Sequence, residues 1–256
     1  MPLITREVRW FFDGRLAAGG AATSAWFAGA TAGGQGGEAG RGAQPEEGRA
    51  EDGRAGDWRT DRYLLLPDTD EIGVKLRQGR LEIKGRHALI GIQRFGDNLE
   101  GEVACWTKWT LAALEWTINS AAWSAIEGNV TLCVAKLRVL RSVRFGEDGV
   151  IAAPAEQGTE PAPLEDSQGG SHGERQWSLQ MELARLRVAG ANADTHWSLA
   201  FEAYPDDPSC CAPFAKAVAT LLAGCPARPL GAERSMSYPR WLQRLDPKMI
   251  RPGRSP

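Results

Sequence analysis

Hydrophobic and polar side chains alternate at every second position in several short segments of the chain. Within residues 5–12, the apolar Val8 and Trp10 fall on one side of an extended strand. Glu7 and Arg9 fall on the other side. The same alternation recurs in six later segments, namely residues 72–77, 81–86, 102–109, 132–139, 179–183 and 197–202. A period of two is typical of strands with two different faces, so the sequence predicts an antiparallel sheet or barrel.

Helical spacing is much rarer in this chain. Residues 212–223 carry Phe214 and Val218 on one helical face, and the following Gly224 is typical of a helix end. Residues 111–123 fit either a short helix or an irregular connection. The sequence therefore predicts few helices, and these lie at the periphery of the sheet.

Two stretches interrupt the pattern of strands. Residues 17–57 are dominated by Gly and Ala, and residues 146–175 are rich in Pro, Gly and Glu. Segments of such composition bury too little apolar surface to offset the entropy that ordering them would cost. We interpret both as disordered insertions in the loops of one domain that spans residues 1–256.

The overall composition is that of an ordinary soluble globular protein. The 256 residues are 43% hydrophobic and 24% charged, with a net charge of −2. A run of about 18 apolar residues is absent from the sequence, and charges at Arg6, Glu7 and Arg9 interrupt any secretory signal. The near-neutral charge does not favour nucleic acid as the ligand. We expect a cytoplasmic protein that does not associate with a membrane.

Cysteine and histidine residues give no recognisable site in the sequence. The five cysteines are odd in number and include the adjacent Cys210 and Cys211, which suit a disulfide framework poorly. The three histidines show no zinc-binding spacing with them. His87 fits the end of a hairpin, although it could also serve as an acid or base beside a phosphate, and Cys105 fits the core. Residues 237–242, beyond the alternating segments, suggest a docking strap or a partner-binding surface.

The polar faces of the predicted strands contain few residue types. Basic side chains alternate with glutamates on these faces: Arg9, Lys75, Arg77, Lys84, Arg86, Lys108, Lys136 and Arg138, with Glu7, Glu82, Glu182 and Glu202. In an open sheet these charges coat a solvated face. In a closed sheet with the charges inside, they line a cationic channel that binds a polyanion, because crowded like charges need a compensating anion. Alternation alone is compatible with both arrangements.

The charged motifs follow one another in an order that points to a known family. The first is Thr5-Arg6-Glu7-Val8-Arg9, and the later ones are Lys75 and Arg77, Lys84 and Arg86, Lys136 and Arg138, Glu182, and Glu202. This order resembles the CYTH, or triphosphate tunnel metalloenzyme, superfamily, whose members begin with a Glu-x-Glu-x-Lys strand. The resemblance covers residues 5–204. It implies a mainly β (α+β) fold, with an antiparallel closed β-barrel that forms a tunnel and a few peripheral helices.

The resemblance also implies a ligand and the residues that bind it. The phosphate groups of a phosphorylated small molecule or a polyphosphate would be held by Arg9, Lys75, Arg77, Lys84, Arg86, Lys136 and Arg138. Glu7, Glu182 and Glu202 would hold Mg²⁺ or Mn²⁺, with Glu7 and Glu202 as the catalytic carboxylates. The metal would polarise the γ-phosphoryl group and position a water molecule for in-line attack.

Two positions depart from the family pattern, and they leave the function open. Thr5 and Ala200 stand where the family has carboxylates. One hypothesis is a metal-dependent triphosphate phosphohydrolase. The alternative is a catalytically degenerate module that binds phosphate compounds, nucleotides or RNA without turnover. A third is an unrelated β-sandwich with a solvated charged face and a protein partner. The sequence does not predict an oligomeric state.

Overall fold

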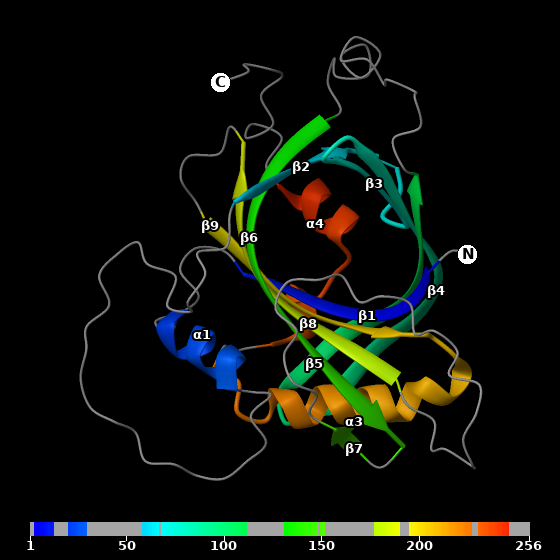
Figure 1. Ribbon diagram of the computed structural model, residues 1–256, viewed down its shortest axis with the longest axis vertical. Helices are drawn as coiled ribbons and strands as arrows, with labels where there is room; N and C mark the ends of the chain where they lie inside the picture. The colour runs from blue at the N-terminus through cyan, green and yellow to red at the C-terminus, as the bar shows by residue number, and fades with distance from the viewer. Residues whose placement is uncertain are drawn as a thin grey trace.

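Eight antiparallel strands close into a barrel (Figure 1). The computed structural model describes residues 3–12, 20–29, 58–66, 68–111, 131–147, 149–151, 177–189, 195–226 and 230–245. The barrel strands are β1 (Leu3–Phe12), β2 (Arg59–Leu64), β3 (Ile72–Arg77), β4 (Arg80–Gly96), β5 (Leu99–Leu111), β6 (Thr131–Gly146), β8 (Trp177–Val188) and β9 (Thr195–Tyr204). Their order is β2-β3-β4-β5-β1-β9-β8-β6, and β6 pairs back with β2 to close the ring. The predicted barrel is confirmed, and the open sheet and the sandwich are excluded.

Each barrel strand separates two different environments by its alternation. In β1, Glu7 and Arg9 line the interior of the barrel, whereas Val8 and Trp10 belong to an apolar core on the outside. Glu7 lies opposite Glu202 of β9 in the register. Because directly opposed residues in a sheet share a face, charged positions gather inside the ring.

The main hydrophobic core lies outside the barrel wall. It is covered by helix α3 (Cys211–Leu222), whose Phe214 and Val218 are fully buried. Trp10 and Phe201 pack edge to face within this core. The helix predicted over residues 212–223 is therefore confirmed, and it holds the wall of the barrel from outside (Figure 1).

A second apolar cluster lies inside the ring, around helix α4 (Tyr238–Arg244) (Figure 1). The ring of Trp241 stacks on Phe11 of β1 with centroids 4.7 Å apart. The hydroxyl of Ser237 accepts a hydrogen bond from the backbone N–H of Arg240 and caps the helix. The interpretation of residues 237–242 as a docking strap is therefore wrong, because this segment fills part of the barrel interior.

Short elements fall inside both segments that the sequence marks as insertions. Helix α1 (Gly20–Gly29) places Phe27 in the outer core with 1% of its surface exposed, so residues 20–29 are not disordered as predicted. Strand β7 (Gly149–Ile151) extends β6. The rest of both insertions, and residues 112–123 of the ambiguous segment, lie outside the described residues. Two short 3₁₀ helices complete the fold, η1 (Pro208–Cys210) and η2 (Ala232–Arg234).

In the part of the chain that the structure describes, no helix has the length and apolar character needed to span a membrane.

Candidate functional site

The barrel encloses a cavity of ≈ 210 Å³ with a strongly charged lining. Among the described residues, eight basic and four acidic side chains line it. They are Arg9, Arg59, Lys75, Arg77, Lys84, Lys108, Lys136 and Arg138, with Glu7, Glu82, Glu182 and Glu202. All the site residues expected from the sequence are in this set except Arg86. The structure thus brings together in one cavity residues that span positions 7 to 202.

Arg86 does not line the cavity. Its guanidinium lies 2.9 Å from Asp70 and 3.2 Å from Glu71, in the segment that precedes β3. Strand β3 begins at Ile72, which pairs with Gly85 of β4, so Arg86 lies just beyond the paired part of the two strands. The carboxylates at the strand end bind it there, and its assignment as a phosphate ligand has no geometric support.

Arg9 connects two of the glutamates expected to bind metal. Its guanidinium lies 2.8 Å from Glu7 and 2.7 Å from Glu182. Burial alone would raise the pKa of Glu7, but the charges of Lys84 and Arg9 more than offset burial and lower that pKa to about 2. The same balance, with Arg9 as the main cation, lowers the pKa of Glu182. Both carboxylates are therefore ionised at neutral pH.

Ala200 lies between Arg9 and Glu182 in the sheet, as the register partner of both. A carboxylate at this position would compete with Glu182 for the guanidinium. The methyl group of Ala200 offers no such competition, so Arg9 reaches across β9 to Glu182. The missing carboxylate is thus replaced by an ion pair between the neighbouring strands.

Lys84 connects the other pair of glutamates. Its ammonium contacts Glu7 and lies 2.9 Å from Oε1 of Glu202. The hydroxyl of Thr5 donates a hydrogen bond of 2.7 Å to the same oxygen of Glu202. Burial disfavours the charge on Lys84, but Glu202 and Glu7 outweigh burial and raise its pKa. Two of the predicted metal ligands therefore converge on one point, and a cation already occupies it.

Asp61 of β2 is a buried acidic residue that sequence reasoning did not find. Its carboxylate is fully buried and lies 3.1–3.6 Å from the basic groups of Arg59, Lys75, Arg77 and Lys136. Burial raises the pKa of this carboxylate, but the cations, Lys136 first, lower it to about 2. Asp61 and the lining residue Glu82, which lies 2.9 Å from Lys75 and 3.0 Å from Arg77, hold the basic side chains in place.

Lys136 lies at the border between the charged cavity and the apolar cluster around α4. Its ammonium is 3.9 Å from the centroid of the Tyr238 ring and donates a 2.5 Å hydrogen bond to the hydroxyl of Tyr63. Only 6% of its surface is exposed. Burial, followed by repulsion from Lys75, lowers the pKa of Lys136 well below that of an ordinary lysine. Lys136 is thus the cation that the unliganded cavity accommodates least well.

The chain matches no family model, no curated protein and no solved structure. The argument for function therefore rests on the geometry and charge of the cavity.

Proposed function

We propose that the barrel cavity binds a triphosphate or another polyphosphate compound. The observation that carries this proposal is the lining, in which eight basic side chains face four carboxylates inside a closed wall. The buried carboxylate of Asp61 behind the lining reduces this positive excess but does not remove it. Lys and Arg are the natural ligands of phosphate oxygens, and a low-dielectric enclosure strengthens each contact. A polyanion would neutralise the excess charge.

The size of the cavity favours a compact ligand. Its volume of ≈ 210 Å³ is below the roughly 300–1,000 Å³ of pockets that enclose drug-sized molecules. Helix α4 also fills part of the barrel interior, which works against a nucleic acid strand running through the barrel. A short phosphate chain, free or attached to a small organic group near the edge of the cavity, fits these constraints.

The carboxylates have the donor chemistry that Mg²⁺ or Mn²⁺ requires. Glu7 and Glu202 converge on the Lys84 ammonium, and Glu182 lies on the other side of Arg9. A divalent cation could replace the ammonium between the two glutamates, which would release Lys84 to contact a phosphate. The metal would supply charge that polarises a phosphoryl group for hydrolysis. On this basis we propose metal-dependent phosphohydrolase activity, with Glu7 and Glu202 at the reacting end.

A second candidate is a binding module without turnover, and the position of Lys84 favours it. The Lys84 ammonium already occupies the point where Glu7 and Glu202 converge. Thr5 and Ala200 supply no further carboxylate for a metal. If Lys84 stays in place, the cavity binds a polyphosphate with its own cations alone.

One experiment separates these functions. The protein is unfolded thermally with tripolyphosphate or ATP, with and without Mg²⁺ or Mn²⁺, and released phosphate is measured in the same samples. Binding to the folded state stabilises it by about 2.7 kcal/mol at a ligand concentration 100 times Kd. A rise in Tm with metal-dependent phosphate release supports the hydrolase, and a rise without release supports the binding module. An unchanged Tm would overturn both.

Variants then locate the binding site. Lys75→Gln and Arg138→Gln each remove one positive charge from the cavity lining. Arg94→Gln removes one from the surface, where the Arg94 side chain is 75% exposed. The two cavity variants are expected to lose most of the ligand-induced rise in Tm, and the surface variant is expected to keep it. Equal rises in all three variants would place the ligand outside the barrel.

A further inference from the structure

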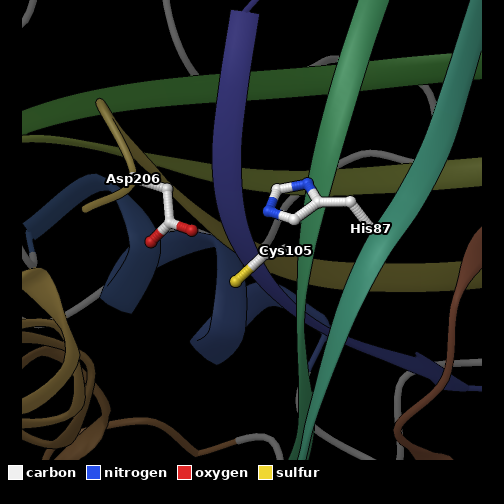
Figure 2. A group of neighbouring side chains, drawn as sticks. All are labelled: His87, Cys105 and Asp206. Atoms are coloured by element: carbon white, nitrogen blue, oxygen red, sulfur yellow. The ribbon is translucent and has the colours of Figure 1, made fainter. Parts of the chain in front are cut away.

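Three side chains with metal-binding atoms meet on the outer wall of the barrel. His87 of β4, Cys105 of β5 and Asp206, just after β9, each offer one ligand atom, and these atoms lie within 4.8 Å of one another. Figure 2 shows the imidazole, the thiol and the carboxylate turned toward a common point. Cys105 faces outward from β5, whereas the next residue, Trp106, lines the cavity. The cluster is therefore separated from the cavity by the barrel wall.

A β-bulge directs His87 into this cluster. The register of β4 and β5 pairs Arg86 with Trp106 and then shifts, so that Ala88 pairs with Cys105 and His87 lies at the irregularity. Bulges insert an extra residue and re-aim its side chain. Nδ1 of His87 lies 3.2 Å from the hydroxyl oxygen of Thr107. In this arrangement the other ring nitrogen faces Cys105 and Asp206 (Figure 2).

The other two side chains are fixed by their surroundings. Cys105 is 2% exposed, and its thiol is hydrogen-bonded to the Asp206 carboxylate. Both Nε and an Nη of Arg6 lie 2.8 Å from the same oxygen, Oδ1 of Asp206. The backbone N–H of Asp206 donates to the carbonyl of Ile4, which ties this residue to β1. Outer partners of this kind orient the ligands of a metal site and hold them ready.

We infer that His87, Cys105 and Asp206 form a binding site for a divalent transition metal ion of the zinc type. Imidazole nitrogen, thiolate sulfur and carboxylate oxygen are the three donors that zinc takes from proteins, at about 2.0–2.3 Å. Ligand atoms at these distances from a tetrahedral ion lie roughly 3.5 Å apart. The exposed imidazole of His87 can close the remaining gap by rotating toward the buried thiol. Three protein ligands leave the fourth position to water or to a small ligand.

This site differs in chemistry from the carboxylates in the barrel. Mg²⁺ and Mn²⁺ prefer oxygen donors, whereas a thiolate and an imidazole select zinc and its close relatives. The outer site shares no residue with the cavity lining. It is therefore independent of polyphosphate binding, and each proposal can fail without the other.

Cobalt is the probe for this site, because a thiolate bound to Co²⁺ gives a charge-transfer absorption that carboxylates do not give. The full chain, freed of metal by a chelator and kept reduced, is titrated with Co²⁺, and Zn²⁺ is then added in competition. We expect saturation of a thiolate band at one Co²⁺ per chain and loss of the band as Zn²⁺ displaces the cobalt. Absence of a thiolate band would overturn the assignment.

Matched variants test the three ligands. Cys105→Ser should abolish the thiolate band, and Cys133→Ser, on β6, should leave it unchanged. His87→Ala changes an exposed side chain, so it leaves the fold intact, and it should weaken Co²⁺ binding by at least about tenfold, the lower end of the loss seen when even an outer partner of a metal site is removed. A band that survives in Cys105→Ser, or unchanged affinity in His87→Ala, would show that the ion binds elsewhere.

Discussion

The ammonium nitrogen of Lys84 lies 2.9 Å from Oε1 of Glu202, on the strand two places away in the barrel wall beyond β5 and β1. The same ammonium contacts Glu7, so a monovalent side-chain cation holds two carboxylates together. A metal ion at this point must compete with a cation that is covalently part of the protein. This contact therefore decides between the two proposed functions.

Removing that cation is expected to create a stronger metal site. Lys84→Met should raise the affinity for Mn²⁺ by at least about tenfold, because unit charges about 4 Å apart interact by roughly 4 kcal/mol at an effective dielectric constant of 20. Mn²⁺ binding is measured by electron paramagnetic resonance. The control is Lys108→Met, since the Lys108 ammonium lies 4.0 Å from Glu82. Equal Mn²⁺ affinities in the two variants would contradict the role assigned to Lys84.

Lys136 is expected to destabilise the protein when no ligand is bound. Burial and Lys75 lower its pKa in the folded state, so the unfolded chain holds this proton more tightly than the folded protein does. The penalty is present at neutral pH and fades as pH rises toward the ordinary lysine value of 10.5. Lys136→Met should therefore gain about 1 kcal/mol of stability near neutral pH and lose affinity for tripolyphosphate.

The Lys136→Met gain is measured by urea unfolding at neutral pH and again near pH 10. It should shrink at the higher pH. Lys216→Met, at an exposed position on α3, serves as the control for removing a positive charge. A Lys136→Met protein that is less stable than the wild type at neutral pH would show that the ammonium is well accommodated.

Asp61 is expected to be the carboxylate on which the barrel depends most. Asp61→Asn removes the negative charge shared by Arg59, Lys75, Arg77 and Lys136, and breaking a buried ion pair on one side costs about 3–5 kcal/mol. Urea unfolding measures this loss. Asp97→Asn, at an exposed turn between β4 and β5, should stay within about 0.5 kcal/mol of the wild type. Similar values for both variants would show that the cations do not need Asp61.

The buried carboxylates predict how stability falls in acid. Glu7 has a pKa of about 2 in the folded protein against 4.5 for a free side chain, and Asp61 about 2 against 3.8. The unfolded chain therefore binds protons first as pH falls, and the stabilisation by these groups is lost between about pH 4.5 and pH 2. Tm should drop through this window, and less steeply in Glu7→Gln than in Glu147→Gln, which changes an exposed residue. Parallel curves would contradict the lowered pKa.

Helix α4 is expected to contribute to stability as a core element. Trp241→Ala should cost about 3–5 kcal/mol, because the indole is 4% exposed and stacks on Phe11 inside the barrel. Trp109→Ala, at a side chain that is 43% exposed, should cost under about 1.5 kcal/mol. Thermal unfolding of both variants gives the comparison. An equally small loss at Trp241 would mean that the helix packs elsewhere in solution.

Strand alternation in the sequence correctly predicted which side chains share a face but not the direction of that face. Val8 and Glu7 necessarily lie on opposite sides of β1, whether the sheet is open or closed. Closure depends on the pairing of β2 with β6, and the sequence of β2 shows no clear alternation of apolar and polar residues. Asp61 was missed for the same reason, although Asp61 and Tyr63 are two positions apart and both face inward.

Other differences come from where strands end and from contacts between distant segments. Arg86 has the parity of Lys84, but β3 stops before it and local carboxylates bind it. Residues 237–244 carry a helix signal, a capping Ser followed by Pro239 in the first turn, yet their burial depends on the ring around them. His87, Cys105 and Asp206 have no motif spacing, because only the bulge and the end of β9 bring them together.

The barrel wall also determines which changes in chain length the protein can accept. Each strand alternates between the charged interior and the apolar outer core, so a one-residue insertion or deletion within β1 would move Glu7 and Arg9 into the core and Val8 and Trp10 into the cavity. A length change between strands leaves both faces as they are. The gene should therefore accumulate insertions at strand junctions, and the Gly- and Ala-rich residues between β1 and β2 are long for this reason.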